Sequence, residues 1–278
     1  MTNVLIIGAT RGLGASLAKK YASQASATVY GTTRSEKGPT DVHEKVIWVP
    51  GIDVAEEGVG RKLVNQLGML GAGGGMTEGG RLVFDVVVCI PITRLMPMRK
   101  LTGYFATEDF TNGPKWEEEV KMYTTSAISP PFITHSLFRA KHLSSGSKLI
   151  LVSSESGSIT LRHAKEGGGN YGHHASKSAL NMVGKLLSLD LKEHGIIVSI
   201  LHPGFMRTEM TKGVGFDQFW DDGGAVTPDE AAESLVQWVE GLGLEKSGEY
   251  WAPRGPRDIG TAEVTIGKGL PTPLQLPW

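Results

Sequence analysis

Short apolar runs alternate along the chain with longer segments whose apolar residues recur at helical spacing. The short runs are continuous rather than alternating, as expected for strands that helices cover on both faces of a parallel sheet. We expect strands at Val4–Ile7, Thr28–Gly31, Val46–Val49, Leu82–Val88, Leu149–Ser153, Ile196–Leu201 and near Glu249–Ala252. We expect helices at Leu13–Ser23, Gly58–Leu67, Trp116–Leu143, Tyr171–His194 and Pro228–Glu240. This order of strands and helices predicts an α/β fold with a parallel sheet.

The pattern contains neither an internal repeat nor a linker, so a single domain over residues 1–278 is expected. Two segments interrupt it and are interpreted as insertions. Residues 68–80 hold seven glycines in thirteen positions, which predicts a flexible surface loop. Residues 90–100 carry two prolines and three basic residues directly after a predicted strand. The proline-rich tail, about 252–278, is expected to be irregular and to pack across a pocket or against a partner subunit.

Composition narrows the partners and the compartment. A net charge of -1 gives no reason to expect nucleic acid or an anionic membrane surface. The sequence has no apolar run of about 18 residues that would span a membrane. The single cysteine, Cys89, excludes an internal disulfide and a cysteine-based zinc site, and the scattered histidines predict no metal site. We expect a cytoplasmic protein.

A glycine-rich turn follows the first predicted strand and leads into the first helix. Glycine lets the backbone approach a pyrophosphate closely, and a helix N-terminus offers N–H groups and the positive end of its dipole. The turn therefore predicts dinucleotide binding in a Rossmann-type, doubly wound sheet. Its candidate residues are Gly8, Thr10, Arg11, Gly12, Leu13 and Gly14.

The end of the second strand bears on which dinucleotide binds. NAD-binding folds usually place a carboxylate there to hold the ribose 2′-hydroxyl. Here the chain reads Gly31-Thr32-Thr33-Arg34, without an acid. Arg34 and Arg11 could bind a 2′-phosphate, and Thr32 lies beside them, so NADP(H) is favoured. Two solvated surface arginines remain the alternative, since Glu36 is close by.

Three later motifs occur in a fixed order. Ser154 stands in Val152-Ser153-Ser154-Glu155-Ser156-Gly157, Lys177 in Ala175-Ser176-Lys177-Ser178-Ala179, and Thr208 follows Pro203-Gly204 by four residues. Together with the glycine turn they resemble the short-chain dehydrogenase/reductase family, over about residues 3–240. The resemblance implies that Ser154 hydrogen-bonds a substrate carbonyl and that Lys177 binds the nicotinamide ribose and lowers the pKa of the proton donor. It also implies that Pro203, Gly204 and Thr208 close over the nicotinamide carboxamide and that Asp53 contacts adenine.

The chain departs from this family at the proton donor. The family's catalytic tyrosine stands four residues before its lysine, where this chain has His173; Tyr171 lies two residues earlier. An imidazole beside a cation is pushed toward its neutral form, a poor acid but a fair base. His173 could work protonated, relay a proton through water, or act as a base. Tyr171 could reach the pocket if the helix begins at Gly172, but two helical residues would turn it about 200° away otherwise.

Two further departures concern the same region. The family's helix asparagine aligns with Ser126, and its Asn-Asn-Ala-Gly motif is absent after the fourth strand. We interpret residues 90–100 as an insertion there, with Leu101-Thr102-Gly103-Tyr104 resuming the family pattern. Downstream, Gly213 to Gly224 holds three aromatic residues, which suits either a mobile lid over an apolar ligand or an amphipathic surface helix.

The sequence thus predicts an NADP(H)-dependent short-chain oxidoreductase that reduces a carbonyl, or oxidises an alcohol, on a small or medium apolar metabolite. Its catalytic candidates are Ser154, Tyr171, His173 and Lys177. One alternative is a non-redox enzyme on the same fold, an isomerase, dehydratase or cyclase with His173 as base. Another is a non-catalytic NADP(H)-binding regulator. The resemblance also suggests a homodimer or homotetramer formed through the two long helices.

Overall fold

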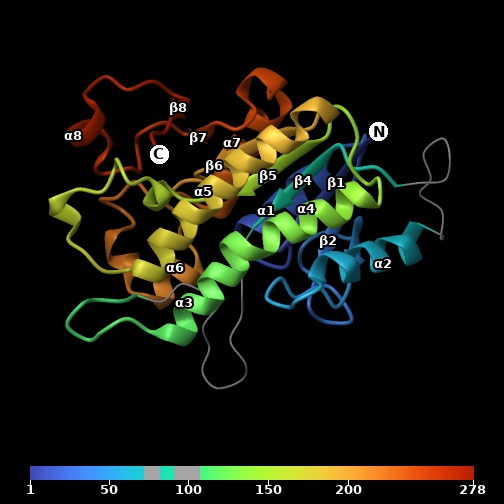
Figure 1. Ribbon diagram of the computed structural model, residues 1–278, viewed down its shortest axis with the longest axis horizontal. Helices are drawn as coiled ribbons and strands as arrows, with labels where there is room; N and C mark the ends of the chain where they lie inside the picture. The colour runs from blue at the N-terminus through green and yellow to red at the C-terminus, as the bar shows by residue number, and fades with distance from the viewer. Residues whose placement is uncertain (72–81, 91–106) are drawn as a thin grey trace.

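One twisted sheet runs through the protein in the strand order β3-β2-β1-β4-β5-β6-β7-β8 (Figure 1). The computed structural model describes residues 1–71, 82–90 and 107–278. Strands β1 to β7 run parallel, whereas β8 is antiparallel to β7. The strands are β1 (Thr2–Ile7), β2 (Ala27–Thr32), β3 (Val46–Val49), β4 (Val86–Cys89), β5 (Lys148–Val152), β6 (Ile197–Leu201), β7 (Tyr250–Ala252) and β8 (Leu274–Gln275). The predicted Rossmann-type parallel sheet is confirmed.

Helices cover both faces of the sheet because successive strand residues point to opposite sides. Val4 and Ile6 of β1 pack with α1 and α7, whereas Leu5 and Ile7 pack with α2, α4 and α5. The α-helices are α1 (Gly12–Ala22), α2 (Val59–Gly71), α3 (Trp116–Tyr123), α4 (Ser129–Arg139), α5 (Tyr171–Leu191), α6 (Glu209–Gly213), α7 (Pro228–Glu240) and α8 (Ala262–Ile266). Short 3₁₀ turns occur at η2 (Glu155–Gly157), η3 (Ala164–Glu166), η4 (Lys192–His194), η5 (Phe216–Phe219) and η6 (Leu244–Lys246).

The long helix expected at Trp116–Leu143 is interrupted by a π-helical turn, η1 (Thr124–Ile128), and ends at Arg139. Pro130 and Pro131 open α4, and proline lacks the N–H that would bond to the carbonyl four residues earlier. Ser129 Oγ donates to the Thr124 carbonyl oxygen at 2.7 Å, which is a bond across this widened turn. The helix axis nevertheless continues, and Figure 1 shows α3 and α4 as one long green rod beside α5.

The start of α5 is anchored by a buried carboxylate that the sequence analysis did not single out. Glu108 Oε2 accepts the Gly172 N–H at 2.9 Å, and the Glu108 carbonyl accepts the Asn170 N–H at 2.8 Å. A carboxylate is favourable at a helix N-terminus because it meets the positive end of the dipole. This contact fixes where α5 begins, and so the direction of the side chains on its first two turns.

The tail proves more ordered than expected. Residues 252–278 include α8 and β8, and Leu274 and Leu276 pack against Tyr250, Ala252 and Ile259 in a separate apolar cluster. Strand β8 pairs with β7 through Ala252 and Leu274 and through Trp251 and Gln275. The expectation of an irregular tail was therefore wrong for these two elements.

The two predicted insertions fall largely outside the described residues. Of residues 68–80, Gly68 to Gly71 form the last turn of α2 instead of a loop, and residues 72–80 are not described. Residues 91–100 and 101–104 are likewise outside the described part of the chain. Ile90, the first residue of the second insertion, is buried and follows β4.

Candidate functional site

A cavity of about 1080 Å³ opens at the carboxyl ends of β1, β5 and β6, beside α5. Strand β1 has β2 on one side and β4 on the other. The order of strands along the chain therefore runs outward in one direction from β1 to β3 and in the opposite direction from β4 onward. Ligands of doubly wound sheets bind at this switch point. The cavity wall brings together part of the glycine turn, all four predicted catalytic residues and the Pro203–Thr208 segment. Among its residues are Arg11, Gly12, Leu13, Ser154, Tyr171, His173, Lys177, Gly204 and Thr208.

The glycine turn is built so tightly that side chains are excluded. Gly8 and Gly12 have positive φ angles of 91° and 51°. A Cβ on Gly14 would lie 2.0 Å from the Gly8 carbonyl oxygen. No side chain caps the first turn of α1, whose N-cap residue is Arg11, and this turn carries no acidic residue. Its bare N–H groups and the cationic Arg11 at the cavity wall fit a dinucleotide pyrophosphate.

Three other predicted cofactor residues lie away from the cavity wall. Thr32 is only 3% exposed, and its Oγ1 accepts the Gly8 N–H at 2.9 Å, so it supports the turn from behind. Arg34 is exposed just after β2. Asp53 Oδ1 accepts the Ala55 N–H at 3.0 Å and thereby stabilises the turn after β3. The structure therefore gives Thr32 and Asp53 supporting contacts within the protein, and for Asp53 this is the capping role that is common for aspartate at strand ends.

Ser154 follows β5 and is joined to α5 through a second serine. Ser156 Oγ lies 2.8 Å from Ser154 Oγ and 3.3 Å from His173 Nδ1. The carbonyl of Ser154 also accepts the hydroxyl of the buried Tyr250 on β7. The strand end carrying Ser154 is thus held from two sides.

Lys177 lies one helical turn after His173 on the same face of α5. Its Nζ donates to the Val152 carbonyl oxygen at 3.2 Å, and burial lowers the pKa of this ammonium to about 7. Burial likewise lowers the pKa of His173 well below its ordinary value, and the charges of Lys177, His174 and Arg162 lower it further. A neutral imidazole at His173 therefore prevails at neutral pH.

Tyr171 is the first residue of α5 and lies at the cavity wall with 37% of its surface exposed. The helix includes it, so its side chain points away from the direction of His173. Ser156 contacts His173 rather than Tyr171. Ser126 is buried within η1, which packs against α5. The histidine is the residue of this group that reaches the serine pair.

Comparison with known proteins identifies the relatives of this chain. Residues 103–218 match the family model described as short chain dehydrogenase. The 1-hydroxy-2-glutathionyl-2-methyl-3-butene dehydrogenase of Rhodococcus sp. (strain AD45) is 35% identical over 108 residues, which cover 39% of this chain and 44% of that enzyme. The alignment thus spans less than half the length of this relative.

Two solved structures share the fold along most of the chain. The NADPH-bound carbonyl reductase from chicken fatty liver has a TM-score of 0.69 and 21% identity, and the match covers 91% of both chains. The carbonyl reductase Sniffer of D. melanogaster has a TM-score of 0.68 and 21% identity, covering 100% of both. Residues 103–218 are thus similar to short-chain dehydrogenases, and most of the chain shares the fold of these two solved structures.

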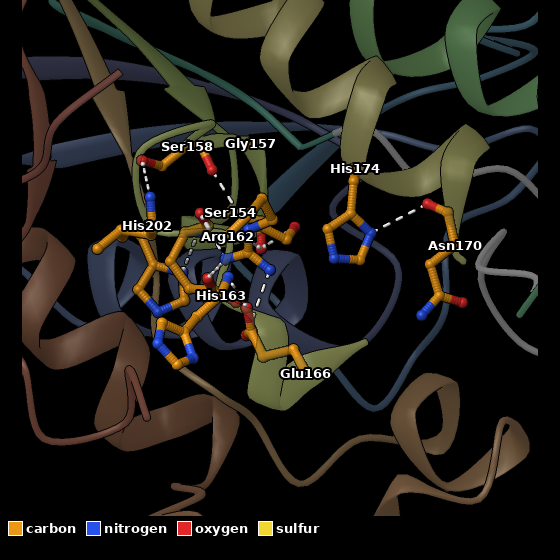
Figure 2. Close-up of polar contacts among 12 residues, drawn as sticks. Ser154, Gly157, Ser158, Arg162, His163, Glu166, Asn170, His174 and His202 are labelled. Carbon is orange, nitrogen blue, oxygen red and sulfur yellow. Dashed lines mark hydrogen bonds and ion pairs between the residues drawn. The ribbon is translucent and has the colours of Figure 1, made fainter. Parts of the chain in front are cut away.

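The cavity has a charged wall that the sequence motifs did not reveal. Arg162 Nη2 donates to Glu155 Oε2 at 2.5 Å, and its Nη1 donates to Glu166 Oε1 at 3.3 Å. Nearby, the His174 ring approaches the Asn170 carbonyl oxygen at 3.0 Å (Figure 2). All five residues line the cavity. The four-residue spacing of Arg162 and Glu166 was the one feature of the sequence that could have indicated this ion pair.

The C-terminal tail also reaches this cavity, which Asp258 lines. Asp258 Oδ2 accepts the Phe205 N–H at 2.5 Å and lies 3.8 Å from His202 Nε2. A Cβ on Gly204 would lie 2.8 Å from the same carboxylate oxygen. Asp258 therefore fixes the turn at Pro203–Phe205. No sequence motif indicated it, because the contact depends on the tail folding back.

Residues 1–71, 82–90 and 107–278 contain neither a metal-binding cluster nor a helix that could span a membrane. No group of three histidine, cysteine or carboxylate side chains there is arranged to hold a metal ion. No helix in those segments is long and apolar enough to cross a membrane.

Proposed function

We propose that this protein is an NADP(H)-dependent oxidoreductase that reduces a carbonyl, or oxidises the corresponding alcohol, on a small or medium metabolite. The observation that carries the proposal is the convergence of Ser154, His173 and Lys177 on the cavity that also contains the glycine turn. A hydride acceptor, a proton path and a dinucleotide would then share one enclosure, as this chemistry requires.

The cofactor would lie across the carboxyl ends of β1 and β4. The N–H groups of the glycine turn would hold its pyrophosphate, and Arg11 and Arg34 its 2′-phosphate. Lys177, Pro203, Gly204 and Thr208 would surround the nicotinamide end. The lack of a carboxylate at Thr33 and Arg34, directly after β2, and the NADPH bound to the chicken carbonyl reductase support NADP(H). When bound, the cofactor supplies or accepts the hydride.

The protein's own groups would handle orientation and the proton. Ser154 would donate a hydrogen bond to the carbonyl oxygen and so stabilise the negative charge that develops there. Lys177 would hold the cofactor, and burial together with the charge of Lys177 would keep His173 neutral. His173 would pass on a proton in place of the family's tyrosine, since it is the residue connected to the serine pair.

The cavity wall suggests a substrate with both apolar and polar parts. Phe205, Phe216 and Phe219 line one part of it, in keeping with the aromatic segment expected to cover an apolar ligand. Arg162 and Glu166 line another part, where a wholly apolar molecule would leave charged groups without water. A metabolite that carries a polar substituent beside an apolar body suits this wall better than a plain hydrocarbon ketone.

A homodimer or homotetramer in the cytoplasm completes the proposal. Large apolar side chains are exposed along α3, α4 and α5, and contiguous exposed apolar surface usually marks an interface. They are Trp116, Val120, Phe132, Met182, Leu186 and Leu189. The cytoplasmic assignment rests on the lone, buried Cys89, which suits a reducing compartment.

Binding and turnover together test this function. Purified protein is titrated with NADPH and NADH, and oxidation of the nicotinamide is then followed with a panel of ketones and aldehydes that carry polar and apolar substituents. We expect tighter binding of NADPH and turnover of at least one carbonyl. Tight NADPH binding without turnover in either direction would contradict the proposed reductase activity. It would instead favour a non-catalytic NADP(H)-binding regulator.

A second function, a non-redox isomerase, dehydratase or cyclase, is favoured by the neutral state of His173, because a neutral imidazole is a competent base. Such an enzyme would convert its substrate without net change in NADPH. Product analysis by mass spectrometry in the same reactions distinguishes the two, since carbonyl reduction adds two hydrogens and isomerisation adds none.

A further inference from the structure

Ser156 connects Ser154 with His173, and the motif that contains Ser154 and Ser156 gave Ser156 no role of its own. It lies in η2, directly after β5, and is 5% exposed. Its hydroxyl is within hydrogen-bond distance of both Ser154 and His173, at 2.8 Å and 3.3 Å. Ser154 and His173 come from different elements, so Ser156 is the bridge between β5 and α5 at this point.

The hydrogen-bond directions along this bridge are determined by Ser154. Its Oγ accepts two hydrogens from Ser156, one from the hydroxyl at 2.8 Å and one from the backbone N–H at 3.3 Å. A hydroxyl oxygen has two acceptor lone pairs, so both are used. The hydrogen of Ser154 itself is then available to a ligand oxygen in the cavity that Ser154 lines.

The same reasoning assigns the tautomer of His173. Because the Ser156 hydroxyl donates to Ser154, its oxygen accepts from His173, and Nδ1 of the imidazole must carry the hydrogen. All hydrogens then point in one direction, from His173 through Ser156 to Ser154. A neutral imidazole can release its Nδ1 hydrogen while Nε2 takes up another, so it transmits a proton without storing one.

The geometry points to Ser156 as the residue that relays the proton from His173 to Ser154 during carbonyl reduction. This inference rests on the proposed function. In the reductive step the carbonyl carbon gains the hydride, and its π-electron pair moves to oxygen. The substrate oxygen takes the hydroxyl proton of Ser154, and Ser154 is reprotonated by the hydroxyl of Ser156. Ser156 in turn takes the proton from Nδ1 of His173, while Nε2 of His173 takes up a proton from solvent. The sum is one hydride and one proton added to the carbonyl.

Ser156 acts through Ser154, so it is a positioning residue and needs a test that a merely structural role would not pass. Ser178 provides the matched control. Its Oγ donates to the Gly157 carbonyl oxygen at 2.7 Å, and thus supports the same turn without touching Ser154 or His173. Ser156→Ala removes the relay, Ser156→Thr keeps a hydroxyl, and Ser178→Ala removes a neighbouring hydroxyl that only supports the turn.

For Ser156→Ala we expect kcat to fall about a hundredfold, with the NADPH Kd and the substrate KM within about twofold of native, because positioned proton transfer contributes about that much. Ser156→Thr should recover most of the loss, and Ser178→Ala should lose little. Equal losses in Ser156→Ala and Ser178→Ala would overturn the relay. The relay would also be overturned if the loss of activity in Ser156→Ala matched a loss of NADPH affinity. The same holds if kcat of Ser156→Thr were as low as that of Ser156→Ala.

Two measurements on the native protein remain decisive even if Ser156→Ala does not fold. The first is a proton inventory in H₂O/D₂O mixtures, where a relay moves several protons and gives a curved dependence of kcat on deuterium content. A straight line would overturn the relay.

The second measurement needs no turnover and so separates failure of the relay from failure of the proposed function. Nitrogen-15 NMR of the histidine rings, with His173→Gln identifying the signal, should show His173 protonated on Nδ1. A ring protonated on Nε2 would overturn the inferred direction of the chain whatever the enzyme's activity. Native protein with the Nδ1 tautomer but no carbonyl turnover would instead contradict only the proposed reductase.

Discussion

At the scale of single residues, burial favours the neutral forms of His173 and Lys177, which lie one turn apart on α5. Lys177 is 9% exposed, and its ammonium donates to a backbone carbonyl rather than to a carboxylate. Desolvation without a counter-charge disfavours the charged form, so the pKa falls to about 7. The folded protein therefore keeps an amine whose charge is easily altered by whatever anion binds next to it.

This shift predicts a pH dependence of stability. Below pH 7 the Lys177 ammonium is charged in both states, and burying that charge destabilises the folded state. Between about pH 7 and pH 10 the amine is neutral in the folded state but still protonated in the unfolded state. The unfolded state then binds more protons, so the free energy of unfolding rises with pH. Relative to the Lys177→Met protein, the free energy of unfolding of the native protein should rise by on the order of 1 kcal/mol per pH unit between about pH 7 and pH 10. Urea unfolding at pH 7, 8 and 9 measures the difference.

Lys185→Met is the matched control, since Lys185 lies two turns further along α5 and is exposed. Its stability should follow that of the native protein across the same pH range. The prediction would be wrong if Lys177→Met and the native protein gave parallel profiles.

At the scale of elements, the unit formed by β1, the glycine turn and α1 is determined by close backbone contact. Thr32 on β2 supports the turn from below, and the Gly14 Cα faces the Gly8 carbonyl from above. The backbone of the glycine turn can therefore approach a ligand closely only while Gly8 and Gly14 carry no side chain and Thr32 keeps its small one.

Gly14→Ala should destabilise the protein by about 2–3 kcal/mol, because its Cβ would lie 2.0 Å from a backbone oxygen that can move only with the strand. Gly68→Ala is the control, since Gly68 lies in α2 with nothing within 4 Å of the added methyl. It should stabilise by about 0.5–1 kcal/mol through helix propensity. Denaturant midpoints compare the two; a Gly14→Ala protein as stable as native would contradict the contact.

At the scale of the whole molecule, the C-terminal segment completes the site that the first 240 residues build. Asp258 is almost fully buried, and the Phe205 N–H and the His202 ring bring its pKa below the ordinary value although burial alone would raise it. The cavity wall on the nicotinamide side is thus held by a residue more than fifty positions away in the sequence.

Asp258→Asn should therefore loosen the turn at Pro203–Phe205. Weakening one hydrogen bond to a charged group would raise the NADPH Kd about tenfold. Binding of 2′,5′-ADP, which lacks the nicotinamide, should change by less than about twofold, since Asp258 contacts Phe205 and His202 rather than the glycine turn. Isothermal titration with both ligands tests this; equal losses for both would show a general loss of structure instead.

The sequence by itself determined the sheet, the glycine turn and the order of Ser154, His173 and Lys177. These depend on local signals: apolar runs for buried strands, glycines where the backbone must turn, and side chains three or four residues apart on one helix face. Only the tertiary structure decided which of His173 and Tyr171 meets the serines, since that depends on where Glu108 starts α5. It also decided that Ser156 bridges them and that Asp258 holds the Pro203–Phe205 turn, because such contacts join segments whose separation in the chain carries no periodic signal.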